Sequence, residues 1–184
     1  DFITEDNTNA SEKHRIAEFA DNRIQDGMTV MLDGGTTTYA VAKFLLKKRV
    51  IVITNSLPIA ALFNEVSTCE TIVTGGTIYN RLGVLYGPVC EANISEMHAD
   101  LAFMGCAGIT KEGIWNSNAM LASFQRAMIN SSDQTYFMAD HSKMNKRALS
   151  LSNRFEECIS IITTKSLDPA IDKALKAAGS TAHI

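Results

Sequence analysis

Six short apolar stretches alternate with helical patterns along this chain, and this alternation constrains its fold more than any other feature. The apolar stretches are four or five residues long, and small or hydrogen-bonding residues follow them. The helical patterns repeat apolar residues at intervals of three and four. Together they predict an α/β fold with a mainly parallel sheet and helices on both faces. The predicted strands cover residues 28–32, 50–54, 71–74, 101–104, 135–139 and 160–164.

Helices are predicted between these strands and before the first of them. Asn9 followed by Glu12 matches the pattern of a capping box, and apolar residues then recur at helical spacing until Gly27 ends the first helix. The other predicted helices cover residues 37–47, 57–65, 90–97, 119–130 and 169–178. Midway along the 119–130 helix, Gln125 and Arg126 are the polar side chains that can reach inward.

The composition is that of one globular domain that can bury a sizeable core, because 46% of the 184 residues are hydrophobic. The net charge of -3 and the pI of about 5.8 argue against a surface that follows nucleic-acid phosphates, which needs clustered Lys and Arg. We expect residues 1–10 to be a linker remnant and residues 11–184 to form the domain. No signal-peptide pattern or membrane-spanning stretch is apparent, so we expect a cytoplasmic protein with no membrane partner.

No cofactor and no metal is expected. No two glycines are separated by a single residue, so the Gly-x-Gly-x-x-Gly fingerprint of nicotinamide and flavin sites is absent. The turn after the first strand also lacks the Gly-Lys-Ser/Thr of a Walker loop. The four cysteines are too widely spaced for a zinc site or a disulfide framework, so buried free thiols are expected at Cys69, Cys90, Cys106 and Cys158.

The strongest local signal is the turn Asp33-Gly34-Gly35-Thr36-Thr37-Thr38, which joins the first strand to the next helix. The unpaired N–H groups and the dipole of a helix N-terminus form an anion site. A tight turn with a threonine cap would need only one glycine and one threonine, whereas this turn has two glycines and three threonines. We predict that Gly35, Thr36, Thr37 and Thr38 hold a phosphate, with Asp33 and Gly34 in the same site.

Small and polar residues also follow the other predicted strands. In an open parallel sheet, ligands lie at the carboxyl ends of the strands. Lys143 is the best candidate for a second charge on the phosphate, while Asp140 fits either a contact with sugar hydroxyls or a cap on its own turn. The predicted ligand site therefore also includes Asn55, Ser56, Gly75, Gly76, Gly108, Asp140 and Lys143.

Residues 77–81 are too polar for a core strand and follow two glycines. They fit a hairpin that brings Arg81 into the ligand site, although an arginine on an exposed loop fits equally well. Asp100 fits either a buried base or a turn residue at a strand entry. His141 has no partner at metal-ligand spacing.

The order of these motifs resembles the effector-sensing domain of the DeoR family of bacterial transcriptional regulators. The resemblance spans nearly the whole chain. The matching motifs are Asn9-x-x-Glu12-Lys13-x-x-Ile16-Ala17, Asp33-Gly34-Gly35-Thr36-Thr37-Thr38, Thr54-Asn55-Ser56, Gly75-Gly76, Asp100-x-Ala102-Phe103-x-Gly105-x-x-Gly108-Ile109, Arg126-Ala127-Met128 and Ala139-Asp140-His141-Ser142-Lys143.

This resemblance implies a ribose-5-phosphate isomerase or coenzyme A-transferase type of α/β fold. It also implies a homo-oligomeric sensor, a dimer or tetramer, that performs no catalysis and binds a phosphorylated sugar to control DNA binding. Operator DNA would be bound through an N-terminal winged helix-turn-helix domain that this chain lacks. The alternative function is a sugar-phosphate isomerase or lactonase, with Asp100 or Asp140 as the base and Lys143 as the electrostatic stabiliser.

Two features depart from the family pattern. The usual Asp-Ser-Gly-Thr-Thr has a glycine at Gly34, so one hydroxyl donor is missing from the predicted phosphate site. Ahead of Arg126 the family usually places acidic residues where this chain has Leu121 and Ser123. These departures are compatible with a different sugar, a weakened site or a different coupling to the dimer surface.

Overall fold

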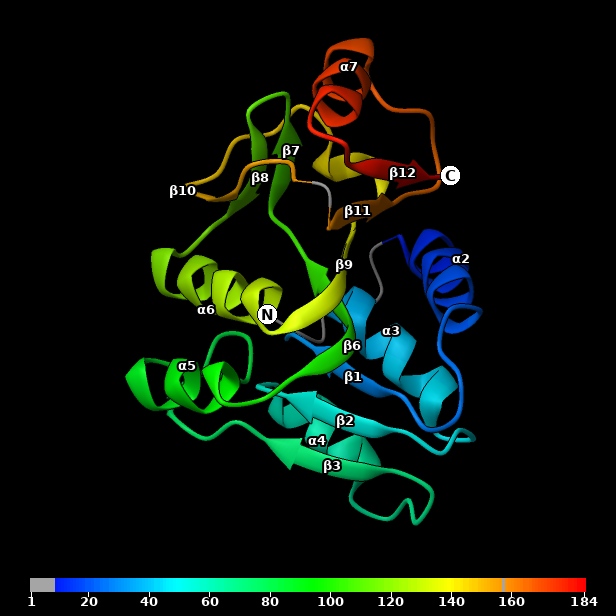
Figure 1. Cartoon of the computed structure of the whole chain (residues 1–184), viewed down its shortest axis with the longest axis vertical. Coiled ribbons are helices and arrows are strands. Elements are labelled where there is room, and N and C mark those ends of the chain that lie inside the picture. Colours follow the sequence, from blue (N-terminus) through cyan, green and yellow to red (C-terminus); the bar gives the residue numbers. More distant parts are fainter. Residues whose placement is uncertain (1–8, 157) are drawn as a thin grey trace.

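A computed structural model describes residues 9–156 and 158–184, and Figure 1 shows its arrangement. Within these residues the main sheet has seven strands in the order β12-β11-β9-β6-β1-β2-β3, and all neighbouring strands are parallel. The strands are β1 (Thr29–Leu32), β2 (Ile51–Thr54), β3 (Glu70–Val73), β6 (Ala99–Gly105), β9 (Ser132–Met138), β11 (Ile159–Ile162) and β12 (Thr181–His183). The predicted parallel sheet is therefore confirmed, and its six predicted strands are all present with ends shifted by a few residues.

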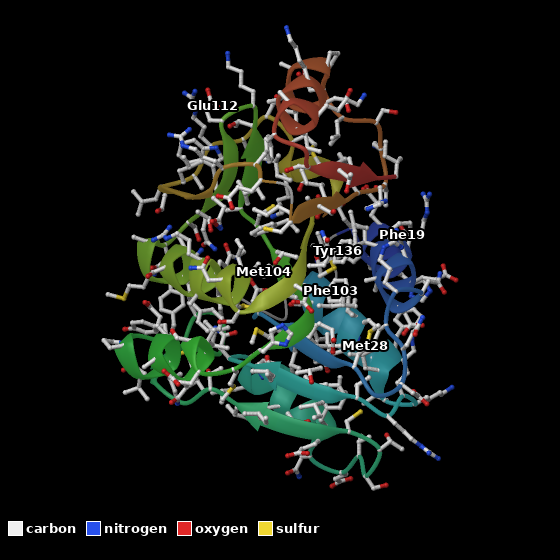
Figure 2. The ribbon with its side chains drawn as sticks, viewed as in Figure 1. Phe19, Met28, Phe103, Met104, Glu112 and Tyr136 are labelled. Carbon is white, nitrogen blue, oxygen red and sulfur yellow. The ribbon has the colours of Figure 1, made fainter. Side chains whose placement is uncertain are left out.

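Helices cover both faces of this sheet, as predicted. One face packs against α2 (Ala10–Asp21), α3 (Thr36–Leu45) and α4 (Leu57–Phe63), and the other against α5 (Pro88–Ser95), α6 (Ala119–Asn130) and α7 (Pro169–Ala177). Successive strand residues point to opposite faces, so Phe103 belongs to the core under α2 and α3 while Met104 belongs to the core under α5 and α6 (Figure 2). Because both faces are buried, the central strands are continuously apolar.

Short antiparallel strands lie outside the main sheet. β4 (Thr77–Tyr79) and β5 (Val84–Tyr86) form the hairpin predicted around Arg81. Sequence analysis did not predict β7 (Gly108–Thr110), β8 (Gly113–Asn116) and β10 (Ser150–Asn153), which form a three-stranded sheet. A single 3-10 turn, η1 (His141–Lys143), follows β9.

The predicted capping box at the start of α2 is wrong. Asn9 is the N-cap residue, but its backbone is left-handed and its side chain makes no capping hydrogen bond. The Glu12 carboxylate instead contacts His141 and Thr164, which are distant in sequence. A tertiary contact has replaced the local one that the motif predicts.

All four cysteines are free thiols, but only Cys90 is fully buried. The other three are partly buried, so the expectation of buried thiols is confirmed in full only for Cys90. The Cys90 sulfur lies 3.0 Å from the Thr74 hydroxyl oxygen. Among the described residues, no helix is long and apolar enough to cross a membrane.

The order of the strands reverses at the centre of the sheet. From β1 the chain continues to β2 and β3 on one side, then returns to place β6 on the other side of β1 before adding β9, β11 and β12. Connections that leave adjacent parallel strands in opposite directions open a crevice at the carboxyl ends of those strands. The ends of β1 and β6 are therefore where a ligand site is expected.

Candidate functional site

A cavity of about 270 Å³ is lined by residues that follow the carboxyl ends of β1, β2, β6 and β9. The structure brings nine of the fourteen predicted ligand residues to its wall. They are Asp33, Gly34, Gly35, Thr36, Thr37, Asn55, Arg81, Asp140 and Lys143. One small metabolite fits a cavity of this size.

The N-terminus of α3 forms one wall of the cavity. Gly35 is the N-cap residue of α3, and no side chain caps the helix there. The Thr38 hydroxyl donates a 2.8 Å hydrogen bond to the Gly35 carbonyl and does not line the cavity. The uncapped N–H groups of the first turn thus remain available to an anion.

The β4–β5 hairpin packs closely against Gly34 of this turn. A Cβ atom at Gly34 would lie 1.9 Å from Cγ1 of Val84, which is buried and also lines the cavity. Such a distance is far below van der Waals contact, so no side chain fits at Gly34 while Val84 keeps its position. Packing against the hairpin therefore requires a glycine at this position.

The Asp33 carboxylate joins the ends of β1 and β6. Its Oδ1 accepts a 3.2 Å hydrogen bond from the Gly105 N–H, and its Oδ2 accepts a 2.7 Å bond from the side-chain amide of Gln125. Burial raises the pKa of Asp33 to about 7, although both hydrogen bonds act to lower it. Asp33 is therefore a hydrogen-bonding carboxyl group that changes charge near neutral pH.

Gln125 reaches inward from α6, as predicted, and is 2% exposed. Its Nε2 also donates to the Gly105 carbonyl at 2.8 Å, and its Oε1 accepts a 2.8 Å bond from the Ser152 hydroxyl. The neighbouring Arg126 instead donates to the Ser152 carbonyl and does not line the cavity. Sequence analysis did not predict the bond between Gln125 and Asp33, because α6 and β1 are distant in sequence.

Asn55 contributes a buried acceptor to the cavity wall. It is 1% exposed, and its Nδ2 donates a 2.9 Å hydrogen bond to the Leu85 carbonyl. Its Oδ1 has no hydrogen-bond partner among the described residues. A buried acceptor without a partner is costly, so a ligand donor placed against Oδ1 would be stabilised.

Three basic side chains line the cavity: Lys13, Arg81 and Lys143. Arg81 comes from the turn of the β4–β5 hairpin, where it is exposed and also borders the cavity, so it fits both interpretations of the sequence. Lys143 lies in η1, which follows β9. Asp140 also lines the cavity, and its Oδ1 accepts a 2.8 Å bond from the Ser142 N–H, so it caps η1 as well.

Sequence analysis missed Lys13, which lies in the first turn of α2 and is 6% exposed. Its spacing from Ile16, Ala17 and Ala20 places it on the buried face of that helix. A lysine on an otherwise apolar helix face was the signal that could have identified it.

Five predicted residues do not line the cavity, and each has another role. Ser56 caps α4 by accepting a 3.3 Å hydrogen bond from the Ile59 N–H. Thr38 bonds within its own turn, as described above. The three glycines allow close backbone contacts or left-handed conformations elsewhere: Gly75 has φ +71°, a Cβ at Gly76 would lie 2.6 Å from the Tyr86 carbonyl oxygen, and one at Gly108 would lie 2.1 Å from the Lys146 carbonyl oxygen.

Neither Asp100 nor His141 lines the cavity. The Asp100 carboxylate accepts a 2.7 Å hydrogen bond from the Thr29 N–H, so its role is structural. Cys106 does line the cavity, but burial raises the pKa of its thiol to about 12, which keeps it protonated at neutral pH. Further walls, missed by sequence analysis, are formed by Tyr79, Leu82, Asn116, Ser117, Leu121 and Phe124.

Comparison with known proteins gives matches that cover most of the chain. Residues 8–165 match the family described as DeoR C terminal sensor domain. An uncharacterised HTH-type transcriptional regulator of Bacillus subtilis, YulB, is 34% identical over 176 residues, which are 95% of this chain and 68% of that protein. The L-fucose operon activator of Haemophilus influenzae is 32% identical over 174 residues, which are 94% of this chain and 70% of the activator.

Among solved structures, ribose 5-phosphate isomerase A from Methanocaldococcus jannaschii has a similar fold. The TM-score is 0.54 at 16% sequence identity, and the likeness covers 74% of this chain and 55% of the isomerase. At this level of identity the likeness concerns the fold alone. It confirms the fold that sequence analysis predicts.

Proposed function

This chain belongs to the DeoR C-terminal sensor domain family, and we propose that its cavity binds a phosphorylated sugar that acts as the effector of a transcriptional regulator. The observation that carries the proposal is the presence of an uncapped helix N-terminus and basic side chains around one small cavity. A phosphate is the group that this combination of N–H donors and cations recognises best.

The phosphate contacts are assigned to the first turn of α3 and to Lys143. Gly35, Thr36 and Thr37 supply backbone N–H groups, and the Thr36 and Thr37 hydroxyls add further donors. Lys143 supplies a positive charge from η1, which follows β9 in the other half of the sheet. Arg81 supplies another positive charge from the β4–β5 hairpin. Together these groups neutralise a phosphate dianion without a metal ion.

The sugar contacts are assigned to the polar groups that remain. Asp33 and Asp140 accept hydrogen bonds from hydroxyl groups, and Asn55 Oδ1 gains the donor that it lacks among the described residues. Sugars carry many hydroxyl donors, so a wall rich in acceptors favours them over apolar esters of phosphate. The apolar side chains of Leu121 and Phe124 then cover one side of the bound molecule.

Binding without turnover suits this arrangement. Asp100, one of the two bases considered for an isomerase or lactonase, holds the backbone of β1 and lies outside the cavity. Asp140, the other, is held by the Ser142 N–H as a cap of η1. We therefore propose a sensor that performs no catalysis, in which residues 11–184 form the effector domain and residues 1–10 link it to a helix-turn-helix domain that binds operator DNA.

A thermal-shift screen against matched pairs of sugars and their phosphates tests this function. A ligand that binds only the folded state raises the melting temperature by mass action. The expected result is stabilisation by one or a few sugar phosphates, with no stabilisation by the parent sugars and no conversion of the ligand detected by NMR. If no phosphorylated sugar stabilises the chain, the proposed effector class is wrong, and conversion of the ligand would restore the enzyme alternative.

A further inference from the structure

Glu12 and Lys13, two adjacent residues in the first turn of α2, are connected to the candidate site in different ways. Lys13 lines the cavity directly. Glu12 does not line it, but the Glu12 carboxylate accepts a 3.2 Å hydrogen bond from the His141 N–H and contacts the His141 ring. His141 begins η1, which supplies Lys143 to the cavity wall.

The rest of α2 packs against α3. Its buried residues Ile16, Ala17 and Ala20 share a hydrophobic core with Val41 and Ala42 of α3. The first turn of α3 is the turn assigned to the phosphate. Figure 1 shows α2 lying beside α3 on this side of the sheet. One helix therefore contacts the cavity, the turn that carries Lys143 and the helix whose N-terminus forms the cavity wall.

We propose that α2 registers whether the cavity is occupied, because Lys13 binds the phosphate of the ligand while Glu12 holds α2 against η1. This inference rests on the proposed function, since it requires a phosphorylated ligand. Lys13, Arg81 and Lys143 share the cavity wall with Asp33 and Asp140, and a bound phosphate would add negative charge beside the three cations. The attraction between Lys13 and the phosphate then holds the first turn of α2 more firmly against the site.

The consequence is a difference in α2 between the free and bound states. A ligand shifts a conformational equilibrium only by its differential affinity for the two states, and Lys13 supplies that difference. Residues 1–8 join the chain directly ahead of this turn. Any domain attached there is therefore connected to the helix whose first turn responds to the ligand.

Hydrogen exchange measured by mass spectrometry tests the proposal, with inorganic phosphate as the probe and sodium chloride used to keep the ionic strength constant. We expect phosphate to slow exchange in residues 34–38 and, by at least about threefold, in residues 10–16. Lys13→Met should weaken phosphate binding by about tenfold or more and remove the response of residues 10–16. Arg15→Met is the matched control, because Arg15 is an exposed cation on the same helix.

A second pair of variants tests the role of Glu12 even if Lys13→Met does not fold. Glu12→Ala should return the exchange of residues 10–16 to its phosphate-free rate, whereas Glu18→Ala, which changes an exposed carboxylate of α2, should not. Protection of residues 34–38 in the original chain without any response of residues 10–16 would overturn this inference and leave the phosphate site standing. Absence of protection in both segments would overturn both.

Discussion

The Asp33 carboxylate accepts a 2.7 Å hydrogen bond from the Gln125 side-chain amide in the wall of the cavity. The two residues are distant in sequence, because Asp33 directly follows β1 and Gln125 lies within α6. Gln125 is held in turn by the Ser152 hydroxyl and the Gly105 carbonyl. Because every polar atom of the Gln125 side chain is engaged, the amide has one orientation and directs an N–H group at Asp33. Asp33 is thus fixed before any ligand arrives.

Asp33 should make the stability of the chain fall as the pH rises toward neutrality. Its pKa is about 7 in the folded state against an ordinary value of 3.8, so between about pH 4 and 7 the folded state keeps a proton that the unfolded chain has lost. The free energy of unfolding should therefore decrease by about 1.4 kcal/mol per pH unit across this window and then level off. Urea unfolding between pH 4 and 8 measures the slope. Asp33→Asn should remove this contribution, and an unchanged slope in that variant would assign it to another group.

Gln125→Leu should destabilise the chain by about 3 kcal/mol, because it leaves the Asp33 carboxyl group and the Ser152 hydroxyl buried without their partner. It should also move the pH at which the stability curve levels off above 7, since Gln125 lowers the pKa of Asp33. The matched control is Gln25→Leu, at an exposed position, which should change stability by less than about 0.5 kcal/mol. A loss of stability without any shift of the pH profile would mean that Gln125 only fills space.

Lys143→Ala should weaken a phosphorylated ligand by about 10- to 100-fold and its unphosphorylated parent by much less, because the proposed role of the lost charge is to bind the phosphate. Titration calorimetry with a sugar phosphate that stabilises the chain, and with its parent sugar, measures the two losses. Lys146→Ala removes an exposed lysine from the adjoining segment and should change neither affinity. Equal losses for both ligands would remove Lys143 from the phosphate site.

Gly34→Ser restores the residue that the family usually has, yet it should destabilise this chain by about 2 kcal/mol, because the new Cβ would lie 1.9 Å from Val84 Cγ1. Val84→Ala removes the obstructing methyl groups at the cost of a cavity. In the double variant the total cost should be smaller than the sum of the two single costs by about 1 kcal/mol or more, as chemical denaturation would show. Additive costs would mean that the hairpin moves away from the turn instead.

The central fold was predictable because its signal is local. A parallel strand buried on both faces is a continuous apolar run, as in Val30 to Leu32, and the runs of β1 and β2 are followed directly by helices with buried apolar residues. The four strands β7, β8, β10 and β12 were missed because none of them has the continuous apolar run that marks the central strands. β7 and β8 each begin at a glycine, and the pairings of β8 with β10 and of β11 with β12 join segments that are distant in sequence.

The candidate site was predictable to the extent that residues at strand ends line its cavity. Asp33 and Lys143 follow predicted strands, so the rule that ligands lie at the carboxyl ends of parallel strands places them correctly beside the cavity. Gly76 and Gly108 also lie near the ends of predicted strands, but they are needed because another segment of backbone packs closely against each of them. A glycine needed for a ligand and one needed for a neighbouring chain segment have the same sequence signal. Lys13 was missed because it precedes the first strand.

The reversal of strand order also has a mechanical meaning. Asp33 and Asn55 belong to the half of the sheet built by β1, β2 and β3, whereas Asp140 and Lys143 belong to the half built by β6, β9, β11 and β12. A molecule held by all four side chains would join the two halves of the sheet, which come from separate parts of the sequence, much as a crosslink closes a long loop. Separating the halves would then require breaking the grip on that molecule as well as the pairing of β1 with β6. A small metabolite bound in the cavity would in this way act as a reversible crosslink between the two halves of the domain.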